Sequence, residues 1–292
     1  MKKRSNPLPL LNGIKPSYLV LPHEKEFYGL PLLHFLCTRF PFVGEENWRR
    51  RLNSGFVVGA DGAPFNEHTV FEAGETMFYY RETSRDSEPR IPFEEKILFV
   101  DEHLIVVDKP HFLPTTPRGA FVAQTALTKL RVREGNPLLV PVHRLDRATA
   151  GVLLFAKTVP ARGLFQTMFA RREVFKEYLA VARPIPNPQA RAAALSGELT
   201  VRTRIEKIRG ELQVRQWDQP SCERELLSPN ATTGVRILTV FDAPGAHHTA
   251  DTPQHTGTIV HPAPGYPITG GQLALYRLRP RTGKTHQLPA PL

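Results

Sequence analysis

The stretch Pro141-Val-His-Arg-Leu-Asp-Arg-Ala-Thr-Ala-Gly-Val-Leu-Leu-Phe-Ala-Lys157 decides how the rest of the chain is organised. Its first half, His143–Arg147, combines two arginines, a histidine and a single carboxylate, Asp146. Its second half, Gly151–Ala156, is a short apolar run typical of a buried strand. A polar loop that leads into such a strand can hold a reactive side chain at the edge of a cleft. The neighbouring guanidinium groups would compensate the charge of Asp146.

The composition indicates a folded, basic protein. The chain has 292 residues, which is enough for two domains, and 41% of them are hydrophobic. Its formal net charge of +10 predicts a polyanionic partner, RNA or DNA. An anionic membrane is the alternative, but no basic amphipathic helix stands out and no run has transmembrane length. We therefore expect no membrane partner.

The cysteine content and the N-terminus indicate a cytoplasmic protein. Cys37 and Cys222 are too few for a disulfide framework or a cysteine-based zinc site, so we expect reduced thiols. Met1-Lys-Lys-Arg4 is basic, but the residues that follow are rich in proline and asparagine rather than apolar. The N-terminus therefore does not read as a secretory signal.

The first part of the chain predicts a small α+β domain behind a flexible basic arm, residues 1–16. Apolar spacing predicts two helices within Leu32–Leu52, separated by Pro41, which cannot lie inside one helix. Gly55–Gly62 and Met77–Tyr80 predict strands. Four arginines are expected on the exposed side of the helices: Arg39, Arg49, Arg50 and Arg51.

This order of elements resembles the S4 RNA-binding module over residues 17–83. The resemblance implies that the four arginines contact RNA phosphates rather than read bases. The alternative is a small α+β cap with a solvated arginine face. Residues 84–92 are polar and contain proline, so we expect them to be a linker.

Residues 93–292 are expected to form a second, larger domain. The predicted strands are Ile97–Asp101, Leu104–Asp108, Gly151–Ala156, Val174–Ala182, Leu199–Ile205, Val235–Phe241 and Leu273–Pro280, and the predicted helices are Thr125–Arg133 and Ala161–Arg172. Residues 243–271 are loop-like and are expected to be an insertion. Four histidines there invite a metal site, but they have no cysteine partner and no helical His pair, so we expect no metal. They are His247, His248, His255 and His261.

The string from His143 to Arg147, followed by Thr149 and Gly151, resembles the active-site motif of RluA-like pseudouridine synthases, which act on large-subunit rRNA and tRNA. The resemblance implies an α+β fold with a mixed, largely antiparallel central sheet flanked by helices. It makes Asp146 the catalytic carboxylate and lets Arg144 fill the space that a flipped uridine vacates. The Lys109-Pro110 pair also matches the family, whose usual glycine two residues later is replaced by Phe112.

Two further motifs extend the resemblance. Phe175-Lys-Glu-Tyr-Leu-Ala180 resembles the second family motif, which implies that Tyr178 stacks on the uracil; the alternative is a half-buried tyrosine of a core strand. Arg281-Thr-Gly-Lys-Thr-His-Gln-Leu288 resembles the third, which implies an ion pair between Lys284 and Asp146. Pro289 and Pro291 cannot continue the helix that the family forms there, so we expect a catalytic domain that is incomplete at its C-terminus.

The resemblance implies the isomerisation of uridines in structured RNA by a monomer. The reaction needs no cofactor, since one ionised carboxylate near C1′ can act by adding to the sugar or by taking a proton from C2′. A second hypothesis is an RNA-binding protein of the same ancestry whose altered C-terminus has impaired catalysis. A third is a glycosidic hydrolase, which usually needs two carboxylates, whereas only Asp146 stands in a motif.

Overall fold

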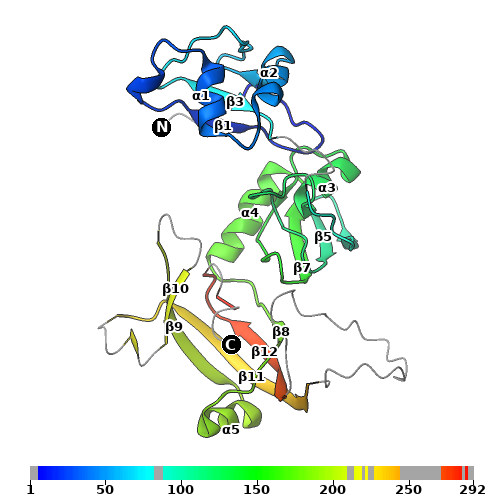
Figure 1. The fold of residues 1–292 in the computed structure, drawn as a ribbon. Helices are drawn as coiled ribbons and strands as arrows, with labels where there is room; N and C mark the ends of the chain where they lie inside the picture. The colour runs from blue at the N-terminus through cyan, green and yellow to red at the C-terminus, as the bar shows by residue number, and fades with distance from the viewer. Residues whose placement is uncertain are drawn as a thin grey trace, which may run out of the picture. The chain divides into compact units, whose positions relative to one another are not determined.

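The chain folds as two compact units in a computed structural model (Figure 1). The units are Met1–Phe165 and Gln166–Leu292, and the boundary falls inside helix α4 (Val159–Ala170). The division at 16, 83 and 92 expected from the sequence stays a prediction. The structure describes residues 6–81, 88–208, 214–218, 221–222, 227–243, 271–284 and 287–288.

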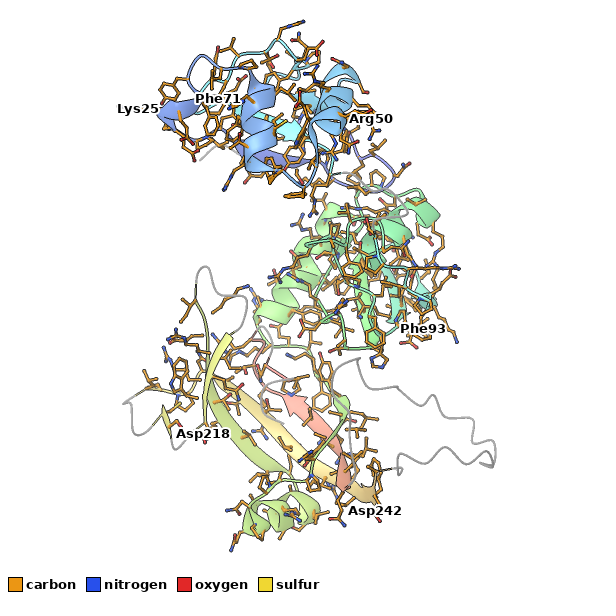
Figure 2. The ribbon with its side chains drawn as sticks, in the orientation of Figure 1. Lys25, Arg50, Phe71, Phe93, Asp218 and Asp242 are labelled. Atoms are coloured by element: carbon orange, nitrogen blue, oxygen red, sulfur yellow. The ribbon has the colours of Figure 1, made fainter. Side chains whose placement is uncertain are left out.

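The first unit begins with a three-stranded antiparallel sheet of order β1-β3-β2. Its strands are β1 (Ser17–Val20), β2 (Val57–Val58) and β3 (Thr76–Tyr79), and the short 3-10 helix η1 (Lys25–Phe27) follows β1. Helices α1 (Leu32–Arg39) and α2 (Glu45–Asn53) lie on either side of Pro41, as predicted. Phe35 packs 4.9 Å from Phe71, ring centre to ring centre, in a core that Figure 2 shows beside α1.

Helix α2 corrects one expectation about its arginines. Trp48, Arg51 and Leu52 are buried together, because residues three and four apart share one face of a helix. Arg51 is only 8% exposed, and its guanidinium lies 4.8 Å from the centre of the Trp48 ring. The expectation that Arg51 lies on the exposed side is therefore wrong. Arg39, Arg49 and Arg50 are exposed, as predicted.

A second antiparallel sheet of the first unit has the order β4-β5-β7-β6. Its strands are β4 (Lys96–Val100), β5 (Leu104–Lys109), β6 (Val140–Pro141) and β7 (Gly151–Ala156). β4, β5 and β7 confirm the strands predicted here, whereas β6 was not predicted. Helix α3 (Ala126–Glu134) is also confirmed. It begins where the Thr125 hydroxyl accepts a hydrogen bond from the Thr128 N–H, and it ends at the left-handed Gly135.

The segments expected to be an arm and a linker make defined contacts within the first unit. The Tyr80 hydroxyl donates to the Pro9 carbonyl over 2.8 Å, and Arg131 donates to the Gly13 carbonyl over 3.2 Å. The buried Glu88 carboxylate accepts the N–H groups of Ala123 and Gln124, both over 2.8 Å. Parts of both connecting segments are therefore fixed by specific hydrogen bonds.

The second unit is a five-stranded antiparallel sheet of order β10-β9-β11-β12-β8, with helix α5 (Pro188–Ser196) against β9 and β11 (Figure 1). The strands are β8 (Tyr178–Ala182), β9 (Leu199–Lys207), β10 (Val214–Asp218), β11 (Ala231–Asp242) and β12 (Gln272–Pro280). Ala194 of α5 packs with Ile237 and Tyr276 in the core of this unit.

The α+β class and the largely antiparallel pairing are thus confirmed. The strand predicted at Val174–Ala182 begins only at Tyr178, and neither β10 nor α5 was predicted. The insertion expected near 243–271, with its four histidines, and the two terminal prolines fall outside the described residues. Within the part of the chain that is described, no helix has the length and apolar character that a bilayer crossing requires.

Candidate active site

Asp146 stands on the loop between β6 and β7. Its backbone carbonyl accepts the Thr149 N–H over 3.0 Å, which closes a turn around the carboxylate. Leu145, immediately before it, is buried, whereas Arg144 and Arg147 on either side are exposed and Asp146 is half-buried. The loop is thus anchored through Leu145 and presents its charged residues toward solvent.

The segment Pro110–Thr115, which follows β5, holds this loop in place. The buried Thr115 hydroxyl donates to the Leu145 carbonyl over 2.8 Å and accepts the Leu145 N–H over 3.2 Å. The His111 Nδ1 lies 2.6 Å from the Ala148 carbonyl oxygen. Because these contacts fall on both sides of Asp146, they restrict the backbone that carries the carboxylate.

Lys109 is the buried cation of this site. Its side chain is fully buried, and its ammonium group donates to the carbonyls of Leu113 (2.8 Å), Pro110 (3.0 Å) and Arg147 (3.5 Å). Burial lowers the pKa of Lys109 from 10.5 to about 8, while the negative charge of Asp146 acts in the opposite direction. Asp146 therefore has a cation within its own unit, a role that sequence reasoning missed. The available signal was a lysine at the end of the apolar strand β5.

Phe112 occupies the place of the family's usual glycine. Its φ angle is +67°, in the left-handed region that glycine adopts freely and that costs other residues about 1 kcal/mol. The loop that follows β5 therefore has, at position 112, a backbone conformation that suits a glycine, even though the residue is a phenylalanine. The substitution is accommodated as backbone strain at this position.

The third motif is organised by Gln287, which sequence reasoning also missed. Its side-chain oxygen accepts from the Thr282 hydroxyl over 2.8 Å and from the Lys284 N–H over 3.1 Å. Its side-chain nitrogen donates to the Thr232 carbonyl and to the Thr233 hydroxyl on β11. Gln287 is 4% exposed, so it ties the loop that carries Lys284 to the sheet. The Lys284 side chain itself is exposed.

Tyr178 begins β8 and is half-buried. It packs against the core of the second unit on the same side as Ala180, while Phe175 and Leu179 are 77% and 65% exposed. Tyr178 and Leu179 therefore lie on opposite faces of β8. Upstream, Lys176 donates to the Thr282 carbonyl over 3.0 Å, and burial lowers the pKa of Lys176. A half-buried ring is compatible with either reading of Tyr178, stacking or core packing.

The predicted site residues are divided between the two units. Asp146 and Arg144 belong to the first unit, whereas Tyr178 and Lys284 belong to the second. The ion pair between Lys284 and Asp146 and the stacking role of Tyr178 therefore stay predictions. Among the described residues, no group of three histidine, cysteine or acidic side chains is placed to hold a metal.

Arginines of α2 form ion pairs and hydrogen bonds with neighbouring side chains. Arg49 pairs with Glu45 at 2.7 Å and with Glu67 at 3.5 Å, and Arg50 donates to the Asn47 side chain. The pairing with Glu45 raises the pKa of Arg49. The predicted role of these arginines, together with Arg39 and Arg51, in RNA binding stays a prediction.

Comparison with known proteins assigns the family. The family of RNA pseudouridylate synthases matches residues 103–290, which include the Asp146 loop, Tyr178 and the third motif. The chain belongs to this family. An uncharacterized RNA pseudouridine synthase of Synechocystis sp. is 31% identical over 158 residues, which cover 54% of this chain and 53% of that protein.

Two relatives carry names that specify an RNA. Ribosomal large subunit pseudouridine synthase D of Xanthomonas campestris is 31% identical over 50% of this chain and 45% of its own length. The mitochondrial tRNA pseudouridine(32) synthase of Saccharomyces cerevisiae is 29% identical over 51% of this chain and 31% of its own length. The chain thus spans about half the length, or less, of these RNA pseudouridylate synthase relatives.

Proposed function

We propose that this chain is an RNA pseudouridine synthase that isomerises uridines in rRNA or tRNA, with Asp146 as the catalytic carboxylate. The observation that carries the proposal is the family match across residues 103–290, which spans the Asp146 loop. The hydrogen bonds from Thr115 and His111 support it, because a catalytic side chain needs a fixed backbone. The buried Lys109 supports it further by placing a positive charge near the carboxylate.

The proposed reaction is a balanced isomerisation. The bond between N1 of the uracil and C1′ of the ribose breaks, the base turns, and a bond forms between C5 and C1′. C5 then loses its proton, and N1 carries one in the product, so no redox partner is required. Asp146 would act either by adding to the sugar or by removing a proton from C2′.

The other predicted residues have supporting roles in this proposal. Turning the uridine out of its helix costs a few kcal/mol, which stacking on Tyr178 and insertion of Arg144 would offset. Lys284 would pair with Asp146 once the RNA is bound. The arginines of the first unit, Arg39, Arg49 and Arg50, would contact phosphates. We further propose that the enzyme acts as a cytoplasmic monomer.

The decisive experiment is the conversion assay with Asp146→Asn. Release of tritium from RNA containing 5-tritiated uridine reports loss of the C5 proton, and it should fall at least about 10²–10⁴-fold. Binding of the RNA in a filter assay should persist, because the substitution preserves side-chain shape. Asp108→Asn is the matched control, since Asp108 is an exposed carboxylate on β5; this variant should keep full activity.

Three outcomes separate the competing hypotheses. Full tritium release by an active preparation of the Asp146→Asn variant would refute the role of Asp146. RNA binding by the wild-type chain without any tritium release would favour the RNA-binding protein of the same ancestry. Free ribose ends in the treated RNA would instead indicate a glycosidic hydrolase.

A further inference from the structure

One face of the second unit's sheet is lined with arginines. Tyr276, Leu278 and Ile237 point into the core on the α5 side, so the residues between them point to the opposite face. We call that side the arginine face. Its members on β9, β11 and β12, together with the residue that follows β12, are Arg202, Arg204, Arg236, Arg277, Arg279 and Arg281.

The strand register brings these arginines next to one another. Arg202 on β9 is opposite Thr232 on β11, and the Arg281 N–H donates to the Thr232 carbonyl over 2.9 Å. Arg236 on β11 is opposite Arg277 on β12. The Arg277 Nε is buried and has no hydrogen-bond partner among the described residues. Side chains that project from adjacent strands in this way lie side by side on one surface.

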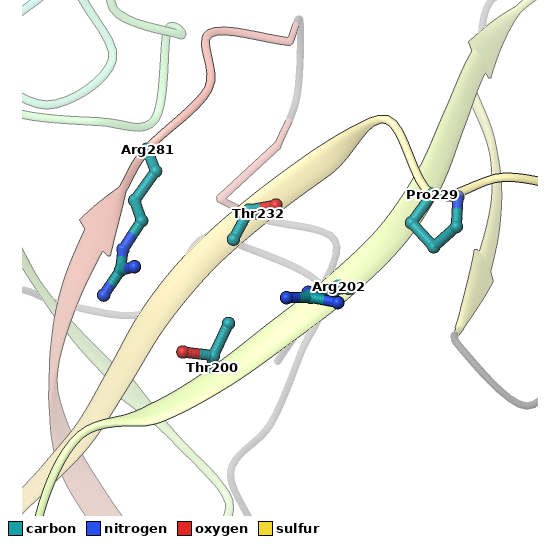
Figure 3. Close-up of a pocket in the computed structure, with 5 residues that line it drawn as sticks. All are labelled: Thr200, Arg202, Pro229, Thr232 and Arg281. Atoms are coloured by element: carbon teal, nitrogen blue, oxygen red, sulfur yellow. The ribbon is translucent and has the colours of Figure 1, made fainter.

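A concavity lies at one end of the arginine face. It has a volume of about 530 Å³ and is lined by Thr200, Arg202, Pro229, Thr232 and Arg281. Figure 3 shows Thr200 and Arg202 on β9, Thr232 on β11 and the Arg281 side chain reaching beside them from the end of β12. Two guanidinium groups and two hydroxyl groups therefore border one space, and no carboxylate lines it.

Among the described residues, acidic side chains pair with some of these arginines but not with Arg202. Glu198 pairs with Arg281 at 3.1 Å and with Arg279 at 3.4 Å. Glu177 and Glu206 pair with Arg279 and Arg204, respectively. Arg202 is exposed and forms no ion pair with any residue in the described ranges. Within the described part of the chain, the concavity therefore contains Arg202 without an ion-pair partner and Arg281, which shares Glu198 with Arg279.

We propose that this concavity binds a phosphodiester group of the RNA backbone. The inference rests on the proposed function for its choice of RNA. A guanidinium group matches two phosphate oxygens with parallel N–H donors, and the hydroxyls of Thr200 and Thr232 can donate to the remaining oxygens. Such contacts position the RNA without reading its bases.

The direct test is Arg202→Gln in the full-length chain. Binding of a fluorescein-labelled tRNA transcript should weaken roughly three- to tenfold at low salt, and the slope of log K against log salt should decrease by about 0.7–0.9, as for the loss of one phosphate contact. Arg183→Gln is the matched control, because Arg183 is exposed in the same unit but does not line the concavity. Its affinity and salt slope should equal those of the wild type.

A second variant, Glu198→Gln, should change the RNA affinity in the opposite direction. Glu198→Gln keeps the side-chain shape but removes the charge that pairs with Arg279 and Arg281, so RNA affinity should rise roughly twofold to fivefold at low salt. This result would not follow from a folding defect, which weakens binding. Circular dichroism and a melting curve check that each variant is folded.

The results separate this inference from the proposed function. Wild-type binding without tritium release would refute catalysis and leave the phosphate site intact if Arg202→Gln still reduced the salt slope. An unchanged affinity and slope in Arg202→Gln would overturn the phosphate site, whatever the activity. If Arg202→Gln weakened the binding of poly-glutamate but left the binding of the tRNA unaltered, the phosphate site would also be overturned, in favour of an acidic protein partner.

Discussion

The burial of the Lys109 side chain predicts how the free energy of unfolding depends on pH. In the folded chain its pKa falls from 10.5 to about 8, chiefly because the side chain is fully buried. In the unfolded chain it returns to about 10.4. Between these two values the unfolded state binds the extra proton, so the free energy of unfolding must increase as the pH rises from 8 to 10.5.

The size of the change in stability follows from how far the pKa of Lys109 is lowered. A fall from 10.5 to about 8 corresponds to about 3 kcal/mol between the charged and neutral forms. Lys109→Met keeps the length of the side chain but cannot titrate. At pH 7 the variant escapes that desolvation cost but leaves the carbonyls of Pro110 and Leu113 without their donor, at about 1–3 kcal/mol each. The opposing effects should keep the two proteins within about 2 kcal/mol at pH 7.

The measurement is urea unfolding of the wild type and of Lys109→Met between pH 7 and 10.5, followed by amide signals from β5 and β7. All other titrating groups are shared, so the difference between the two free energies isolates Lys109. It should be flat up to about pH 8 and then shift by about 3 kcal/mol in favour of the wild type between pH 8 and pH 10.5. A difference that stays flat to pH 10.5, or a Lys109 side-chain resonance that titrates near 10.5, would refute the reasoning.

Two hydrogen-bonding side chains give further predictions. Thr115→Val keeps the shape but removes both bonds to Leu145, so the first unit should lose about 2–4 kcal/mol in urea unfolding and tritium release should fall; Thr115→Ser should restore both. Gln287→Ala removes two hydrogen bonds within the third motif and two between that motif and β11, so the second unit should lose about 2–4 kcal/mol in thermal unfolding. Stability equal to that of the wild type would show that water replaces the lost partners.

The sequence was most informative where apolar residues follow a clear period. β5 and β7 combine apolar runs with flanking polar turns, and both strands were predicted within a residue or two. β10 has few apolar residues and pairs along its whole length with β9, so its conformation depends on that partner rather than on its own pattern. α5 carried a readable signal, an asparagine cap at Asn187 followed by Pro188, but its alanine-rich sequence has no strong apolar stripe.

The site residues show the same difference. Features formed by residues adjacent in sequence were predicted, and contacts between residues far apart in sequence were not. The loop that carries Asp146 was predicted because its charges and the following strand are adjacent in sequence. The role of Lys109 was not, because one of its acceptors, the Arg147 carbonyl, lies 38 residues away. β8 starts late for a similar reason: it pairs with β12 only from Tyr178 onward, while Lys176 bonds to Thr282 instead.

The residue opposite both Thr200 and Arg279 is Gly234, and the Glu198 side chain lies across it. A β-carbon at position 234 would overlap the Glu198 carboxyl group, so even a single methyl group there must displace it. Displacement would separate Glu198 from Arg281 and leave Arg279 paired with Glu177 alone, which would make the sheet surface more positive without altering any ionisable residue. Relatives with the same number of charged residues could therefore differ in their affinity for a polyanion because one has glycine at position 234 and another has a residue with a β-carbon there.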